Sequence, residues 1–124
     1  MARILVIDDE EPVRAMIRQM LERAGHVVEE AQDGEAGVHA FRAHPPDLVV
    51  TDILMPRKGG LLAIKEIRAL SPEARIIAIS GGGKTGRLSF LSTARTFSGV
   101  RTLKKPFRRA ELVGLVEEVL HGSG

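Results

Sequence analysis

Near its N-terminus the chain reads ILVIDD (residues 4–9), four apolar residues followed directly by two aspartates. An apolar run of this length is too short for a helix and is typical of a strand that is buried on both faces. Strands of this kind belong to parallel sheets, which helices cover on both sides. The run therefore predicts an α/β protein whose first strand ends where the acidic side chains begin.

The residues after this strand have the pattern of an amphipathic helix. Apolar side chains, Met16 among them, recur at helical spacing over residues 13–24, and basic side chains such as Arg14 lie on the opposite side. Pro12 suits the first turn of this helix, and Gly25 suits its end. We expect Met16 to pack in the core and Arg14 to lie on the polar side.

The same alternation of strand and helix continues along the chain. Further strands are predicted from short apolar runs at residues 27–28, 48–50, 76–79 and 100–103. Further helices are predicted over residues 36–41, 61–70, 88–97 and 112–120. Five strands alternating with five helices predict a doubly wound α/β fold with a five-stranded parallel sheet. The length of 124 residues fits one domain, with its core over residues 3–121 and a tail at 122–124.

Composition excludes several classes of protein. Apolar residues make up 44% of the chain, which is enough for a folded core, so intrinsic disorder is not expected. The absence of cysteine rules out disulfides, thiol catalysis and cysteine zinc sites. No apolar run approaches the roughly 18 residues that a membrane-spanning helix needs, and the N-terminus does not have the pattern of a signal peptide. We therefore expect a cytoplasmic protein without membrane insertion.

Polar residues at the ends of the predicted strands indicate a site. Because the crossovers of a parallel sheet are right-handed, the carboxyl ends of its strands open on one edge, where ligands bind. The residues that end or follow the strands are Asp8, Asp9, Asp52, Ser80 and Lys105. Crowded carboxylates repel one another unless a cation lies among them. Ligands that offer only oxygen favour Mg²⁺, or Mn²⁺ in its place.

At this point the sequence resembles the receiver domain of bacterial two-component response regulators. The motifs that carry the resemblance are ILVIDDE (residues 4–10), DLVVTDILMP (residues 47–56), GL (residues 60–61), IS (residues 79–80) and KPF (residues 105–107). It covers the chain from about Arg3 to Leu120. The resemblance implies the flavodoxin-like α/β fold with strand order 2-1-3-4-5.

The resemblance also implies a role for three of the strand-end residues. Asp52 matches the phosphoacceptor, which takes a phosphoryl group from a phosphohistidine on a sensor histidine kinase or a histidine phosphotransfer protein. Ser80 matches the switch hydroxyl, and Lys105 matches the lysine that pairs with the phosphoryl group. Pro106 matches a proline whose preceding peptide bond is usually cis in the family.

For the metal, the resemblance implies a binding site made of side chains and one backbone group. Asp8, Asp9 and Asp52 match the carboxylates around the metal, and the backbone carbonyl of Leu54 matches a further ligand. The resemblance implies a signalling phosphoacceptor rather than a conventional enzyme, although it participates in its own phosphorylation and dephosphorylation. Its output would pass to a downstream protein target. No direct binding to nucleic acid is expected, because no recognition motif accompanies the run from Arg87 to Arg109, which contains no acid.

Two alternatives to this interpretation stay open. Thr102 occupies a position that is usually aromatic in the family, which favours a phosphorelay intermediate that passes its phosphoryl group to another histidine protein. The second alternative is a nucleotide-binding protein, because Gly83-Lys84-Thr85 follows a strand as in a P-loop. That motif needs a glycine five residues before Gly83, where this chain has Ala78.

Overall fold

The computed structural model describes residues 1–53, 60–80 and 100–121. Within these ranges five strands and four helices form in the following order: β1 (Arg3–Ile7), α1 (Glu11–Arg23), β2 (Val27–Ala31), α2 (Gly34–Ala43), β3 (Leu48–Asp52), α3 (Gly60–Leu70), β4 (Ile76–Ser80), β5 (Val100–Lys104) and α5 (Arg109–Leu120). The strands pair in parallel in the order β2-β1-β3-β4-β5. The predicted doubly wound fold and its strand order are therefore confirmed. The helix predicted over residues 88–97 and the tail at 122–124 lie outside the described residues.

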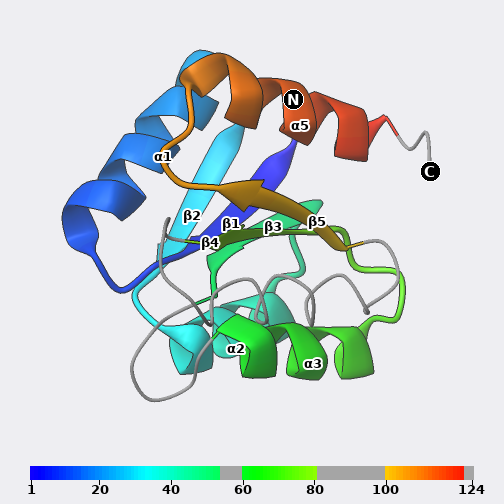
Figure 1. Ribbon diagram of the computed structural model, residues 1–124. Helices are drawn as coiled ribbons and strands as arrows, with labels where there is room; N and C mark the ends of the chain where they lie inside the picture. The colour runs from blue at the N-terminus through cyan, green and yellow to red at the C-terminus, as the bar shows by residue number, and fades with distance from the viewer. Residues whose placement is uncertain (54–59, 81–99, 122–124) are drawn as a thin grey trace.

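Helices cover both faces of the sheet, with α1 and α5 on one side and α2 and α3 on the other (Figure 1). Alternation along the strands explains this arrangement, because successive side chains point to opposite faces. In β1, Ile4 and Val6 pack in the cluster that contains Ile17 of α1, whereas Leu5 and Ile7 pack in the other cluster. All four β1 side chains are almost completely buried. This double coverage is the reason why the apolar run of β1 is continuous rather than alternating.

Local signals set the end of α1, as the sequence predicts, and the start of α2. Gly25, just after α1, has a φ of +96°, a left-handed conformation that glycine adopts without strain. Asp33 precedes α2, and its side-chain oxygen accepts a hydrogen bond from the backbone N–H of Ala36 at 2.8 Å. That bond satisfies one of the free N–H groups of the first turn.

Close packing between α2 and β1 depends on a glycine. A Cβ atom added to Gly37 would overlap the side chain of Ile7. The absence of a side chain at this position therefore lets α2 lie close to the end of β1, next to the start of the acidic motif.

The structure corrects the prediction for Met16. Its side chain is 41% exposed, whereas Ile17 and Leu21 form the buried stripe of α1. Met16 precedes Ile17 by one residue, which places it about 100° around the helix and at the margin of that stripe. Met20, four residues further along the helix, packs against the core cluster. The strands predicted at 27–28 and 100–103 extend to Ala31 and Lys104.

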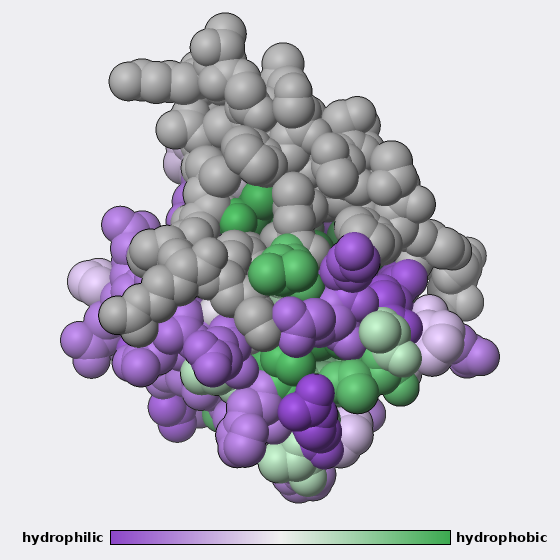
Figure 2. Space-filling view, turned by 90° about the horizontal axis from the view of Figure 1, so that it is seen from below, coloured by the Kyte–Doolittle hydropathy of each residue, from purple (hydrophilic) through white to green (hydrophobic). Residues whose placement is uncertain are grey.

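The surface on the side of α2 and α3 is mostly hydrophilic in the part of the chain that the structure describes (Figure 2). Hydrophobic residues are visible there in smaller patches between hydrophilic ones. On α3, Leu62 and Leu70 are each nearly half exposed. Among the described helices, none is long and apolar enough to cross a membrane.

Candidate functional site

The polar residues that the sequence analysis predicted as site residues lie at the carboxyl edge of the sheet. Asp8 follows β1, Asp52 ends β3, Ser80 ends β4 and Lys105 follows β5. Asp8, Asp52 and Ser80 are between 1% and 5% exposed, which is unusual for such polar residues. The parallel strand register brings them to this edge, since Asp52 lies opposite Ile79, the residue before Ser80.

Lys105 joins three of these strand ends. Its Nζ lies 3.0 Å from Oδ2 of Asp52 and 3.8 Å from Oδ2 of Asp8. Its backbone N–H donates a hydrogen bond of 2.7 Å to the carbonyl of Ser80. The peptide bond between Lys105 and Pro106 is cis, as the resemblance implied. The side chain of Lys104, which the alternation of the strand turns away from Lys105, is exposed.

Three carboxylates meet close to this ammonium. One oxygen from each of Asp8, Asp9 and Asp52 lies within 4.8 Å of the other two. Asp9 is exposed, whereas the other two side chains are buried. Hard oxygen donors of this kind suit a divalent cation such as Mg²⁺, which keeps some of its waters. Leu54, whose carbonyl the sequence nominated as a further ligand, lies outside the described residues.

Burial and mutual charge change the acidity of two groups in this site. Burial of the carboxyl raises the pKa of Asp8 to about 6, and the nearby Asp52 adds to the rise. A hydrogen bond from the Glu10 backbone N–H and the charge of Lys105 oppose it. For Lys105, burial lowers the pKa, but the hydrogen bond to Asp52 and the attraction of both aspartates leave it above its ordinary value.

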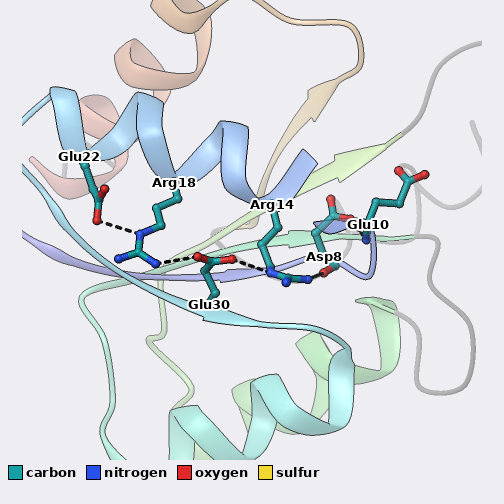
Figure 3. A network of polar contacts seen from close by, with 6 residues as sticks. All are labelled: Asp8, Glu10, Arg14, Arg18, Glu22 and Glu30. Atoms are coloured by element: carbon teal, nitrogen blue, oxygen red, sulfur yellow. Dashed lines mark hydrogen bonds and ion pairs between the residues drawn. The ribbon is translucent and has the colours of Figure 1, made fainter. Parts of the chain in front are cut away.

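Arg14 is a contact of the site that the sequence analysis missed. Its Nη1 donates a hydrogen bond of 2.8 Å to the backbone carbonyl of Asp8 (Figure 3). Its side chain is 14% exposed, so it does not lie in the solvent as the helical pattern predicted. The residue that could have indicated this contact is Glu30, the ion-pair partner of Arg14. It lies in β2, an edge strand that the sequence analysis predicted only at residues 27–28.

Comparison with known proteins identifies the family to which this fold belongs. The family profile described as the response regulator receiver domain matches residues 4–117. The chain belongs to the receiver-domain family of response regulators. Receiver domains are phosphoacceptor switches of two-component systems, and those of the chemotaxis type are signalling proteins.

Individual relatives of this receiver domain cover nearly the whole chain. It is 35% identical to the chemotaxis protein CheY of Bacillus subtilis (strain 168), over 96% of this chain and 98% of that protein. It is 32% identical to the chemotaxis protein CheY of Thermotoga maritima, over 94% of this chain and 96% of that protein. A receiver domain protein from Clostridium thermocellum superposes with a TM-score of 0.88 at 29% identity, over 98% of this chain and 95% of that structure.

The family assignment bears on the site and on the alternatives. Receiver domains bind Mg²⁺ at a cluster of aspartates, and Asp8, Asp9 and Asp52 form such a cluster here. They interact with histidine kinases or phosphotransfer proteins and with downstream targets. Gly83-Lys84-Thr85, on which the alternative of a nucleotide-binding P-loop protein rests, lies outside the described residues.

Proposed function

We propose that Asp52 of this chain accepts a phosphoryl group from a phosphohistidine on a sensor histidine kinase or a histidine phosphotransfer protein. The observation that carries this proposal is the 3.0 Å contact between Nζ of Lys105 and Oδ2 of Asp52. It puts a carboxylate nucleophile beside a cation that neutralises phosphoryl oxygens. Asp8 and Ser80 lie at the same edge of the sheet.

In the proposed transfer, a carboxylate oxygen of Asp52 attacks phosphorus while the P–N bond to the donor histidine breaks. A P–O bond forms at Asp52, and the electron pair of the P–N bond returns to the imidazole nitrogen, which takes up a proton from solvent. The ammonium of Lys105 neutralises negative charge on the phosphoryl oxygens, as in-line phosphoryl transfer requires. Loss of the phosphoryl group to water would reset the switch.

The residues present fit the divalent cation that the family uses. Asp8, Asp9 and Asp52 would hold Mg²⁺, or Mn²⁺ in its place, together with the carbonyl of Leu54. The ligands are all oxygens, and two of the three carboxylates are buried, so they gain from a compensating cation. When bound, the cation neutralises charge on the phosphoryl group.

We assign the response to phosphorylation to Ser80. Its hydroxyl would donate a hydrogen bond to a phosphoryl oxygen, while its carbonyl already accepts the backbone N–H of Lys105. The downstream target is proposed to be a protein, not a nucleic acid. Within the basic run from Arg87 to Arg109, Arg101 pairs with Glu118 of α5 at 2.7 Å, and Arg87 and Arg95 lie outside the described residues.

A phosphorelay intermediate is the alternative within the same family. Thr102, which lies opposite Ala78 in the sheet, takes the place of the family's aromatic residue. A protein that only passes the group on has less need of an aromatic switch. Transfer of the phosphoryl group from Asp52 back to a separate histidine phosphotransfer protein would favour this alternative.

The proposal is tested by intact-mass spectrometry after treatment with acetyl phosphate and Mg²⁺. We expect the parent protein to gain one phosphoryl group and Asp52→Asn to gain none. Glu73→Gln, which changes an exposed carboxylate far along the chain from Asp52, is the matched control and should behave as the parent. Equal phosphorylation of Asp52→Asn would overturn the assignment.

A further inference from the structure

The backbone and side chain of Asp8 are held by three separate hydrogen bonds. Its N–H donates to the carbonyl of Ala31 at 3.1 Å, and its carbonyl accepts from Nη1 of Arg14 at 2.8 Å. Its Oδ1 accepts from the backbone N–H of Glu10 at 2.9 Å. Its other carboxylate oxygen, Oδ2, faces Lys105. The three bonds leave Asp8 little freedom to turn away from the site.

Among these bonds, the one from Arg14 comes from a charged side chain that is itself held by an ion pair. Nε of Arg14 donates to Oε1 of Glu30 at 2.7 Å, so two edges of one guanidinium contact Glu30 of β2 and Asp8, which follows β1. Figure 3 shows Arg14 reaching from α1 to Asp8 on one side and to Glu30 on the other. The guanidinium contacts the carbonyl of Asp8, not its carboxylate, so it leaves the carboxylate oxygens to other partners.

Glu30 is ionised where it holds this guanidinium. Hydrogen bonds from Arg18 and from Arg14 lower the pKa of Glu30 below its ordinary value. Arg18 contacts the second oxygen of Glu30 at 2.7 Å and also contacts Glu22 at 2.9 Å. The four residues form the α1–β2 ion-pair network, in which Arg14 is 14% exposed and Arg18 is 45% exposed. Only the Arg14 end of the network reaches the site.

We propose that Arg14 is a positioning residue for divalent-cation binding at Asp8, Asp9 and Asp52. Held by Glu30, it fixes the carbonyl of Asp8 and thereby the peptide that links Asp8 to Asp9. The direction of that peptide decides where the two neighbouring carboxylates point. This inference rests on the proposed function, since it requires that the three aspartates bind the cation.

Arginine suits this role because of its shape. A guanidinium donates through two edges in a fixed plane, whereas a lysine ammonium is a point charge on a flexible stem. Arg14→Lys therefore keeps the charge near the site but cannot hold both Glu30 and the Asp8 carbonyl in the same geometry. Partners that orient metal ligands from outside the coordination sphere typically change metal affinity by about 10- to 100-fold when they are replaced.

The test is a Mg²⁺ titration followed by ¹⁵N chemical shifts, which reports binding without any phosphorylation. We expect Arg14→Lys to weaken Mg²⁺ binding by about tenfold. The matched control is Arg18→Lys, which alters the same network at its exposed end, and we expect its affinity to stay within twofold of the parent. Urea unfolding of both variants separates loss of affinity from loss of stability.

A second variant approaches the same contact from its other end. Glu30→Gln keeps the size of the side chain but weakens its hold on Arg14, and it should also weaken Mg²⁺ binding. Because both changes disturb one contact, the double variant should lose less affinity than the two single losses combined. Glu30→Gln alone decides the question should Arg14→Lys fail to fold.

The outcomes separate this inference from the proposed function. If the parent binds Mg²⁺ and Arg14→Lys binds it equally well, Arg14 has no positioning role. An equal loss in Arg18→Lys would also overturn the inference, because the whole network would then act only through stability. If the parent itself does not bind Mg²⁺, both the proposed metal site and this inference are wrong.

Discussion

The ammonium of Lys105 lies 3.0 Å from Oδ2 of Asp52, although β4 runs between β3, which Asp52 ends, and β5, which Lys105 follows. The contact is possible because both residues stand at the carboxyl edge of the sheet, where Asp52 is the last paired residue of β3 and Lys105 follows β5. The ammonium of Lys105 also lies among crowded carboxylates, since its Nζ is 3.8 Å from Oδ2 of Asp8. Lys105 therefore stabilises the acidic site before any phosphoryl group arrives.

Removing this ammonium should destabilise the metal-free protein. Lys105→Met leaves buried carboxylates without their cation, and we expect a loss of about 1–3 kcal/mol in the free energy of unfolding, less than for a fully buried pair. The loss should shrink in an Asp52→Asn background, where part of the repulsion is gone. Urea unfolding in EDTA measures both, and Lys104→Met, at an exposed neighbour, is the control. Equal losses for the two lysine variants would contradict the prediction.

The raised pKa of Asp8 predicts a particular dependence of stability on pH in the metal-free protein. With a pKa of about 6 in the folded chain and 3.8 as the ordinary value, folding favours the protonated carboxyl. The contribution of the protonated Asp8 carboxyl to the stability of the fold is complete below pH 3.8 and is lost as pH rises through 6. At pH 7.5, Asp8→Asn should therefore be more stable than the parent by about 1–2 kcal/mol. Below pH 4 the difference should largely vanish.

Urea midpoints measured in EDTA between pH 3.5 and 8 would show this convergence. Asn keeps an oxygen that can accept the Glu10 N–H, so the variant changes the charge more than the local geometry. Asp33→Asn, at the N-cap of α2, is a control outside the site. A constant difference across the pH range would mean that Asp8 titrates as it does in the unfolded chain.

Mg²⁺ should raise the melting temperature, because a ligand that binds only the folded state stabilises it. Asp9→Ala should lose most of this gain, since Asp9 supplies the exposed carboxylate of the cluster. Glu11→Ala removes an exposed acid on the first turn of α1 and should respond to Mg²⁺ as the parent does. Scanning calorimetry with and without millimolar Mg²⁺ measures the shifts in melting temperature. An undiminished rise in the melting temperature of Asp9→Ala would exclude Asp9 as a ligand.

Much of the fold could be predicted because its signals lie within single elements. The continuous apolar runs of β1, β3 and β4 are buried on both faces, and that burial is what excluded polar residues from them. The order of the strands came from the family resemblance, since alternation alone predicts a doubly wound sheet but not the order of its strands. Asp8, Asp52, Ser80 and Lys105 were found because strand ends converge in such sheets.

The parts that were missed depend on contacts between elements. Nothing in the pattern of α1 indicates that Arg14 turns toward the Asp8 carbonyl, because its partner Glu30 lies on a separate strand with a mixed polar sequence. Arg101 looked like part of an uncompensated basic run, but Glu118 of α5 lies beside it in space. Met16 was misplaced because a helical stripe has margins that spacing alone cannot resolve.

Two glycines in helices should respond in opposite ways to alanine. In Gly37→Ala the new methyl group would overlap Ile7, and we expect a loss of about 1–3 kcal/mol in stability. Gly114 in α5 has no atom within 4 Å of the position of a Cβ, so Gly114→Ala should gain about 0.5–1 kcal/mol from helix propensity. Urea unfolding compares the pair directly. A similar effect of both substitutions would show that packing against Ile7 does not limit residue 37.

At the opposite edge of the sheet, His26 ties the N-terminus to α5. Its Nδ1 accepts the backbone N–H of Ala2 at 3.2 Å, so the proton of the neutral ring is on Nε2, which donates to Glu117 at 3.0 Å. The His26 side chain is 5% exposed, whereas His121, which also contacts Glu117, is 77% exposed. His26→Ala should therefore lower stability by about 1–3 kcal/mol, since it leaves a buried N–H without its acceptor. His121→Ala should cost almost nothing. The ¹⁵N shifts of the ring report the tautomer independently, and a proton on Nδ1 would contradict the arrangement even if the stability loss were as expected.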